Sequence, residues 1–309
     1  MPKTKKAKYH LRNWKEYNRA LVGRGSLTFW IEEGAISGWL NEEKNGKRGR
    51  PYTFADLAIN CMSMLKAVYH LPLRATQGMT VSILELMKIT LTVPSYSTLS
   101  RRRQRLEIKL PHQSKDKPIH LVVDSSGIKV YGEGEWKVRQ HGWSKRRTWR
   151  KLHLGVDEST GEIIAAVVTD KGTADKETLP DLLAEVDAEI GQVSGDGGYD
   201  YMTAYQSIAQ YNARASIPPR RNALIWNNGQ MDARDENVRR IRKIGRKKWK
   251  KESNYHRRSL AENAFFRYKL VLGDRIYERL FDTQACEILI RCAVLNKITH
   301  LGMPDSYVA

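Results

Sequence analysis

The stretch SNYHRRSLAENAFFRYKLVLG, residues 253–273, organises the rest of this sequence. We predict a helix here, because Ser253 or Asn254 can act as its N-cap and Gly273 as its C-terminal stop. Four polar side chains then share one helical face: Tyr255, Arg258, Glu262 and Lys269. Five apolar residues fall largely elsewhere and are expected to pack inward: Leu260, Phe265, Phe266, Val271 and Leu272.

The polar face of this predicted helix has two interpretations. A carboxylate flanked by a Tyr, an Arg and a Lys is costly to bury, but it suits a site that holds a metal ion beside a phosphate. The alternative is an exposed ion pair between Arg258 and Glu262, four residues apart on a solvated helix.

The charge of the chain indicates a polyanionic partner, nucleic acid before a membrane surface. The 309 residues include 53 Lys and Arg against 34 Asp and Glu, a formal net charge of +19. The positive charge is clustered: residues 239–251 carry nine basic side chains and no acid, and residues 137–151 carry seven, with Trp143 and Trp149 between them. Residues 239–251 are expected to grip DNA, with a solvated loop as the alternative.

Other composition features exclude several classes of protein. The three cysteines, Cys61, Cys286 and Cys292, lack metal-ligand spacing and are expected to be reduced core thiols. No apolar run approaches the length of a membrane span, and the N-terminus lacks the apolar region of a signal peptide. We therefore expect no membrane partner and a cytoplasmic location.

The first third of the chain is expected to form a basic arm, residues 1–52, and a helical DNA-binding domain, residues 53–112. Within the arm, residues 47–51 (KRGRP) resemble a minor-groove hook, with a basic linker as the alternative. Three helices are predicted next, over 53–68, over 80–91, and from Ser95 or Ser97 to about residue 108. In the third, Arg101, Arg102 and Arg105 share a face, as in a helix-turn-helix recognition helix, or they line an Arg-rich surface helix. Residues 111–117 are predicted to be a linker.

From residue 118 the pattern changes to strands. Apolar runs at 119–123, 152–156 and 163–168 predict three strands, the last two joined as a hairpin by the turn at 158–161. A helix with Pro180 in its first turn follows, then a strand at 192–195, a helix from about residue 201 and a strand at 215–219. Residues 220–252 show little apolar periodicity, and a last helix is predicted over 283–300. The catalytic domain is thus expected to span 113–309, with a basic insertion at about 218–253.

Three carboxylates are placed to meet in this order of elements. Asp124 ends the first predicted strand and Asp196 ends the fourth, and such strand ends converge in a mixed α/β sheet. A helix packed across that edge adds Glu262. Three acids repel one another unless divalent ions compensate them, and oxygen ligands suit Mg²⁺ or Mn²⁺. Taken singly, Asp124 and Asp196 have another interpretation, in which each anchors the turn that follows it.

Three motifs carry a family resemblance. They are Asp124-Ser125-Ser126-Gly127 followed by the run at 128–138, Asp196-Gly197-Gly198-Tyr199-Asp200, and Tyr255, Arg258, Glu262 and Lys269 at the spacing of a Y-R-E-K signature. With these motifs the chain resembles bacterial insertion-sequence transposases of the DDE type, more narrowly the insertion sequence five family. The resemblance covers the whole chain. It implies a ribonuclease-H-like catalytic core, a mixed five-stranded sheet with helices, preceded by a helix-turn-helix-type domain.

The resemblance also implies an activity. A transposase of this kind binds the terminal inverted repeats of its element, cleaves a phosphodiester at each end and joins the 3′-hydroxyls to target DNA. Asp124, Asp196 and Glu262 would be catalytic and would hold two Mg²⁺ ions, with Mn²⁺ as a substitute. The partner would be double-stranded DNA, and the pairing of two ends favours a homodimer.

Further residues are expected to contact DNA. By charge and reach, Arg258 and Lys269 would contact phosphates near the scissile bond, and Tyr255 would stack on or hydrogen-bond to the DNA end. Trp226 either stacks on an unpaired base or packs in the protein. In the basic run, the DNA contacts are assigned to Arg246, Lys247 and Lys248.

Two other functions remain open from the sequence. One is a catalytically silent DNA-binding regulator, which is disfavoured because all three acids are present. The other is a metal-dependent nuclease that cuts without joining. Tyrosine-nucleophile recombination fits poorly, because no Arg and His constellation surrounds Tyr255 to activate it.

Overall fold

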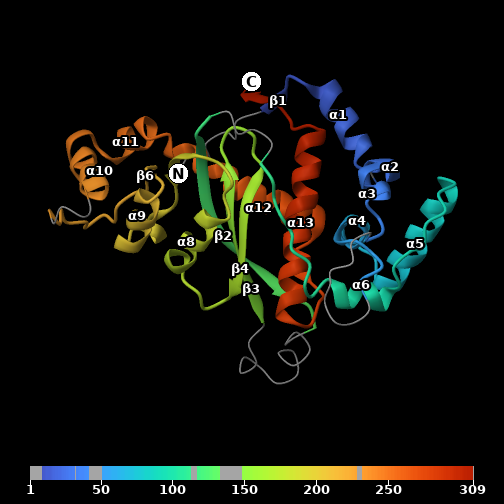
Figure 1. The fold of residues 1–309 in the computed structure, drawn as a ribbon. Coiled ribbons are helices and arrows are strands. Elements are labelled where there is room, and N and C mark those ends of the chain that lie inside the picture. The colour runs from blue at the N-terminus through green and yellow to red at the C-terminus, as the bar shows by residue number, and fades with distance from the viewer. Residues whose placement is uncertain are drawn as a thin grey trace, which may run out of the picture. The chain divides into compact units, whose positions relative to one another are not determined.

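The computed structural model describes residues 9–31, 33–41, 51–112, 117–132, 148–227 and 232–308 (Figure 1). The chain divides into two compact units. Unit 1 comprises residues 1–106 and 294–309, and unit 2 comprises residues 107–293. Three stretches named above lie wholly or partly outside the described residues: 47–50 of the predicted hook, 137–147 of the first basic run, and 133–138 after the Asp124 motif.

Unit 2 is built on a mixed sheet. Its described strands are β2 (Ile119–Val130), β3 (Trp149–Asp157), β4 (Ile163–Asp170), β5 (Ile190–Ser194), β6 (Arg214–Ser216) and β7 (Arg275–Ile276). They run in the order β4-β3-β2-β5-β6, and β7 pairs with β2. Strand β3 is antiparallel to β2 and β4, whereas β5 and β7 are parallel to β2 and β6 is parallel to β5. This mixed α/β sheet fits the expected ribonuclease-H-like core, but the expected number of five strands is wrong, because β7 pairs with β2 as a sixth.

The helices of unit 2 supply the layers around the sheet. They are α8 (Asp175–Ala184), α9 (Met202–Ala209), α10 (Asp232–Ile244), α11 (Arg246–Glu252) and α12 (Ser259–Leu272), with 3₁₀ helices η2 (Gly197–Tyr199) and η3 (Tyr255–Arg258). Helix α13 (Phe281–Leu301) contributes residues to both units. Its predicted span of 283–300 is confirmed within two residues.

One face of the sheet packs against α8 and α9. Leu121 and Val123 of β2 join Leu182 and Leu183 of α8 and Ile208 of α9 in a single buried core. Because side chains alternate along a strand, the residues between them face the other way. Asp124 and Ser126 lie on that second face, where they contact residues of η3 and α12. The alternation of β2 therefore decides which of its residues reach the Glu262 helix.

The Glu262 helix differs in detail from its prediction. Residues 255–258 form η3, and the α-helix begins only at Ser259, because Asn254 adopts a left-handed backbone (φ 54°). Gly273 ends it at φ +87°, as predicted. Phe265 is buried, but Phe266 is 65% exposed, so the expectation that Phe266 packs inward is wrong.

Two predicted elements of unit 2 have wrong boundaries. The first strand was expected to end at Asp124, but β2 continues to Val130, with Asp124 opposite Leu154 inside the ladder with β3. Gly127 allows this continuation because it has no side chain. A Cβ at this position would lie only 3.0 Å from the Trp149 ring. Pro180 was expected in the first turn of its helix. Helix α8 instead begins five residues earlier, at Asp175, and the ion pair between Asp175 and Lys151 stabilises this start.

Helices α10 and α11 were not predicted, because much of their packing is polar. Arg234 and Asp235, which apolar periodicity would leave outside, are both buried in α10. The only large apolar residue of α11, Trp249, is buried as well. The basic run 239–251 thus lies on two helices rather than in a loop.

Unit 1 is helical apart from a small strand pair. It contains α1 (Trp14–Gly23), α2 (Leu27–Trp30), α3 (Glu33–Ser37), α4 (Asp56–Val68), α5 (Leu73–Leu86) and α6 (Tyr96–Arg102), and β1 (Tyr9–Leu11) pairs antiparallel with β8 (Ser306–Val308). Helices α4, α5 and α6 pack against one another. The second predicted helix starts seven residues too late, since α5 begins directly after Pro72.

The third predicted helix is shorter than expected. Ser95 is its N-cap, as predicted, and its hydroxyl accepts a hydrogen bond from the Thr98 backbone N–H. The helix ends at Arg102, so Arg105 lies beyond it and the expected three-arginine helical face is wrong in extent.

Three further expectations concern the chain as a whole. Cys61, Cys286 and Cys292 are buried free thiols, as predicted. Among the described residues, no helix has the length and apolarity needed to cross a membrane. The division into 1–52, 53–112 and 113–309, with an insertion at 218–253, stays a prediction, and His112 of the expected linker is in fact buried against Asp157.

Candidate active site

The predicted site begins with Asp124 on β2. Its Oδ1 accepts a hydrogen bond from the Ser125 backbone N–H at 2.9 Å, and its Oδ2 lies 3.3 Å from the Arg258 guanidinium. Arg258 belongs to η3 and also bonds to Glu262, on the first turn of α12. One guanidinium therefore bridges two of the three predicted carboxylates.

Asp196 follows β5 with one residue, Gly195, between them, so the predicted strand at 192–195 ends one residue earlier than expected. It caps η2, and its Oδ1 accepts the Gly198 backbone N–H at 2.7 Å. Gly195, before it, has no room for a side chain, because a Cβ would lie 2.8 Å from the Tyr199 ring. Asp196 thus anchors its glycine turn, and its charge also acts on the Asp124 carboxyl. The same carboxylate of Asp196 therefore anchors the glycine turn and acts on the site around Asp124.

Electrostatics joins the acids into one site. Burial raises the pKa of Asp124; the Ser125 N–H and Arg258 oppose this, and the charges of Asp196 and Glu262 add to it. Burial also raises the pKa of the neighbouring Tyr199 hydroxyl, and the charges of Asp175, Asp124 and Asp196 act in the same direction. The negative charge of the site is therefore incompletely compensated.

The remaining signature residues border the same site. The Lys269 ammonium donates to the Ser126 hydroxyl at 2.7 Å, two residues from Asp124 along β2. Tyr255 is half-buried, and burial raises its pKa, with Arg258 acting against it and Asp196, Glu262 and Asp124 acting with it. The structure thus brings Tyr255, Arg258 and Lys269 to the carboxylates.

The three predicted carboxylates fit a divalent cation only in part in this structure. Among the described residues, no group of three or more His, Cys, Asp or Glu side chains is arranged to hold a metal ion. The positive charge between Asp124 and Glu262 comes instead from Arg258. Hard carboxylate oxygens that already attract a cation have the chemistry that Mg²⁺ or Mn²⁺ requires.

A fourth acid, Asp175, was not predicted from the sequence. It lies in the first turn of α8, and its Oδ1 is 2.8 Å from the Lys151 ammonium and 3.4 Å from His153 Nδ1. Burial alone would raise its pKa, but hydrogen bonds from His153, Lys151 and Ser125 outweigh burial and hold the pKa far below its usual range. No local sequence signal marks this residue, because its partners Lys151 and His153 come from β3.

The three arginines near the end of unit 1 that are predicted to contact DNA differ in exposure and in the contacts they make within the protein. Arg101 is exposed on α6, with its Nε 3.3 Å from the Ser97 carbonyl oxygen. Arg102 donates to the Phe54 carbonyl and the Asp56 carboxylate, and its guanidinium stacks 4.0 Å from the Tyr52 ring centroid. Arg105 is exposed beyond the helix. Arg102 is therefore partly occupied by structural contacts.

Trp226 packs against a buried ion-pair network. Its ring lies 3.9 Å from the Arg234 guanidinium, and its backbone N–H donates to Asp235. Arg234 is itself buried and bonded to Asp200 at 2.9 Å. With 42% of Trp226 exposed, the residue is neither packed in the core nor free to move widely.

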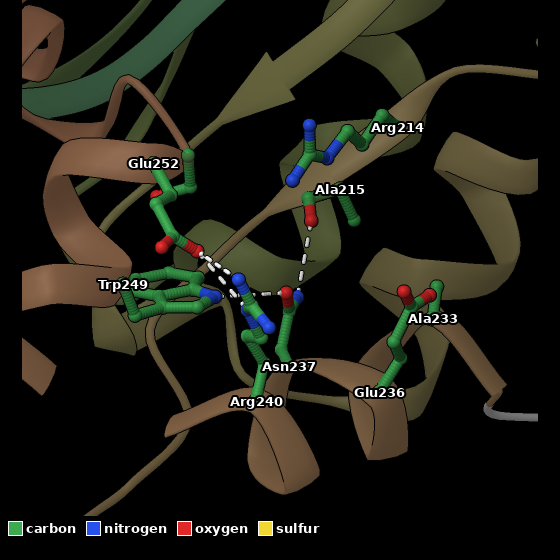
Figure 2. Close-up of a pocket in the computed structure, with 9 residues that line it drawn as sticks. Arg214, Ala215, Ala233, Glu236, Asn237, Arg240, Trp249 and Glu252 are labelled. Carbon is green, nitrogen blue, oxygen red and sulfur yellow. Dashed lines mark hydrogen bonds and ion pairs between the residues drawn. The ribbon is translucent and has the colours of Figure 1, made fainter. Parts of the chain in front are cut away.

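Arg240 and Trp249 of the basic run line a pocket of about 370 Å³ between β6, α10 and α11 (Figure 2). The Trp249 indole N–H donates to Asn237, Asn237 donates to the Ala215 carbonyl, and Arg240 pairs with Glu252 at 2.7 Å. The Trp249 ring lies 6.0 Å from that of Tyr255. Trp249 therefore lines the pocket and also pairs with the ring of Tyr255.

The three predicted cations of this run lie on α11 beside that pocket. Lys247 and Lys248 are exposed, whereas Arg246 donates to the Pro219 carbonyl at 2.6 Å. The two lysines are therefore the freer pair.

The comparison with protein families identifies the family of this chain. A family model described as Transposase DDE domain matches residues 115–297, and a second model with the same description matches residues 22–133. The first match spans more than half of the chain and includes all three predicted acids. The chain belongs to the DDE transposase family. It is a transposase, its partner is DNA, and DDE transposase domains depend in general on divalent metal ions.

A likeness to a solved structure is weaker. The chain aligns with a piggyBac transposase in the cryo-EM structure of its synaptic complex with hairpin DNA. The alignment covers 96% of this chain and 78% of that one, at 10% identity and a TM-score of 0.37, too low to bear on the fold.

Proposed function

We propose that this transposase binds the terminal inverted repeats of an insertion sequence, hydrolyses a phosphodiester at each end, and joins the exposed 3′-hydroxyls to target DNA. The proposal includes membership of the insertion sequence five group with the Y-R-E-K signature. The observation that carries it is the Arg258 bridge between Asp124 and Glu262, with Asp196 in electrostatic range of both Asp124 and Arg258.

Asp124, Asp196 and Glu262 would hold two Mg²⁺ ions, or Mn²⁺ in their place. When bound, two such ions about 3.5–4 Å apart activate the attacking oxygen and stabilise the leaving oxygen of a phosphodiester. Arg258 competes with a cation for the oxygens of Asp124 and Glu262. A DNA phosphate offers its guanidinium an alternative partner, so DNA binding would free the two carboxylates.

The other signature residues would position the DNA end. Lys269, anchored on Ser126, places an ammonium beside β2 for a phosphate near the scissile bond. Tyr255, between Trp249 and the acids, presents a ring or hydroxyl to the DNA end. Ser125, bonded to Asp175, fixes the backbone that carries Asp124.

DNA binding would extend over both units. Arg101, Arg102 and Arg105 would contact the inverted repeat through a helix-turn-helix-type arrangement of α4 to α6. Arg246, Lys247 and Lys248 would hold flanking phosphates, and the fixed Trp226 ring would stack on an unpaired base. A homodimer would pair the two ends.

The test is to incubate the protein with a duplex ending in the terminus of its element and Mg²⁺, and to map nicks on each strand. We expect one nick at the element boundary that exposes a 3′-hydroxyl, followed by joined products when target DNA is added. Cutting without joining would identify a metal-dependent nuclease, and end binding without cutting would identify a regulator. Either result would overturn the proposal.

A further inference from the structure

The outer face of α12 exposes an apolar pair in line with the predicted catalytic acid. Phe266 and Leu270 follow Glu262 at intervals of four residues, so the three lie on one ridge of the helix. Phe266 is 65% and Leu270 70% exposed, although Ala261, Phe265 and Tyr268 of the same helix are buried. We call Phe266 and Leu270 the α12 ridge.

The position of the ridge relates it to the acids. A helix rises 1.5 Å per residue, so Phe266 lies about 6 Å from Glu262 along the axis, roughly two base-pair steps of 3.4 Å. Helical side chains all lean toward the N-terminus, so the Phe266 ring and the Glu262 carboxylate are displaced in the same direction and keep about this spacing. A substrate whose backbone is held at Glu262 therefore passes over the ridge.

The charge around the ridge favours a polyanion as its partner. Residues 246–272 carry nine Lys and Arg against two carboxylates, Glu252 and Glu262. Lys269, between the two ridge residues in sequence, is partly exposed and bonded to Ser126 beside Asp124. A stable protein interface needs about 800 Å² on each partner, whereas an aromatic side chain buries only about 150–250 Å². Two exposed apolar side chains on a strongly basic segment of a DNA transposase fit bases of DNA better than a second protein.

We propose that the α12 ridge is a wedge that contacts base faces of the DNA end within about two steps of the cleaved bond and unstacks them. The proposal rests on the proposed function, because it places the scissile bond at Glu262. It assigns DNA distortion to residues outside the Y-R-E-K signature. Phe266 supplies the stacking surface, and Leu270 supports it one turn further along.

The test uses duplex ends that carry the fluorescent base 2-aminopurine at successive positions around the boundary of the element. Wild-type protein, bound in EDTA, should raise the fluorescence at one or two positions, because an unstacked base is less quenched. Phe266→Ala should abolish that rise and slow nicking in Mg²⁺ about tenfold, and Phe266→Trp should restore both. Leu280→Ala, which truncates a 56% exposed residue outside α12, is the matched control and should change neither.

Several outcomes would overturn the wedge. Undiminished fluorescence with Phe266→Ala, while the wild type nicks normally, would refute the wedge and leave the proposed function standing. If Phe266→Ala dissociates a dimer in sedimentation but leaves the fluorescence rise unchanged, the ridge is a contact between two copies of this chain. A wild type that binds ends but never nicks them would refute the proposed function, and the fluorescence would still decide whether the ridge unstacks bases. Thermal unfolding of Phe266→Ala should match that of the wild type, because the side chain is exposed.

Discussion

Two aspartates on one pair of strands show opposite electrostatics. Asp124 on β2 and Asp157 at the end of β3 lie three residue pairs apart in the same antiparallel ladder. Asp157 lies 2.9 Å from the His112 imidazole and accepts hydrogen bonds from the Ser159 N–H and hydroxyl and the Thr160 hydroxyl. Among the described residues, the contacts of Asp124 are the Ser125 N–H and Arg258 at 3.3 Å.

The pKa values follow the donors. Burial acts on both carboxyls to raise the pKa, but the donors around Asp157 outweigh it and lower the pKa, whereas those around Asp124 do not. A structural carboxylate has its lone pairs occupied by the protein. The Asp124 site keeps oxygen lone pairs available, which is what a cation-binding site requires.

The largest expected contrast is in catalysis. Glu262→Gln removes a charge but little volume from a half-exposed side chain, so we expect nicking in Mg²⁺ to fall at least about a thousandfold while end binding stays near wild type. Asp157→Asn, corrected for its folded fraction, should nick at the wild-type rate. Nick mapping on matched amounts of folded protein measures both. A Glu262→Gln variant with near wild-type cleavage would reject the site.

The next contrast is in stability. Asp157→Asn replaces an acceptor-only carboxylate with an amide and leaves buried donors without a partner, so we expect a loss of about 1–3 kcal/mol in the free energy of unfolding. Asp124→Asn should instead leave stability unchanged or raise it at neutral pH, because it removes an under-compensated buried charge. Urea denaturation measures both. Equal destabilisation by the two substitutions would contradict the comparison.

The pH dependence should separate the same pair. The folded pKa of Asp157 is lowered, so its stabilisation is present above the ordinary unfolded value of about 3.9 and is lost as the pH falls through the folded value. The folded pKa of Asp124 is raised, so its contribution is a cost that grows as the pH rises from the unfolded value through the folded one. Asp157→Asn should therefore flatten the acid side of the stability curve, and Asp124→Asn should steepen it. Urea midpoints between about pH 3 and 7 provide the measurement.

A smaller effect is expected from the arginines at the end of unit 1. Replacement of Arg101, Arg102 and Arg105 with Ala should weaken end binding and reduce the slope of log affinity against log salt by about 0.9 for each phosphate that the variant no longer neutralises. Arg102 should contribute least, because it also holds the start of α4 through Asp56. Binding titrations at several salt concentrations test this, and an unchanged slope would exclude α6 from DNA binding.

The smallest effect is expected at Trp226. Trp226→Ala should weaken end binding only about five- to tenfold, because it removes one stacking surface and leaves the Arg234 network intact. Trp226→Phe should restore most of that affinity. Unchanged end binding by Trp226→Ala would assign the ring to packing alone.

The parts of the fold that local signals specify were predicted well. Gly273 ends the Glu262 helix because its positive φ suits glycine, Ser95 caps α6, and Asp196 follows its strand. The β3–β4 hairpin followed from alternation and a turn signal. Each of these depends on a few adjacent residues.

The failures involve partners that are distant in sequence. Asp124 was placed at a strand end because nothing local shows that Trp149 packs on Gly127 and that β3 extends the ladder. Asp175 escaped notice because its partners, Lys151 and His153, come from β3. Helices α10 and α11 were missed because buried ion pairs replace an apolar stripe. Phe266 was wrongly expected to pack inward because an apolar side chain carries no local sign that it is exposed.

The most direct test of the carboxylate site is a Mn²⁺ titration followed by electron paramagnetic resonance, with the DNA end fragment bound. We predict two tightly bound ions for the wild type, and loss of one or both for Asp124→Asn, Asp196→Asn and Glu262→Gln, while Asp157→Asn binds as the wild type does. Mn²⁺ binding that is unchanged by all three site substitutions would contradict the assignment of these acids to a common metal site.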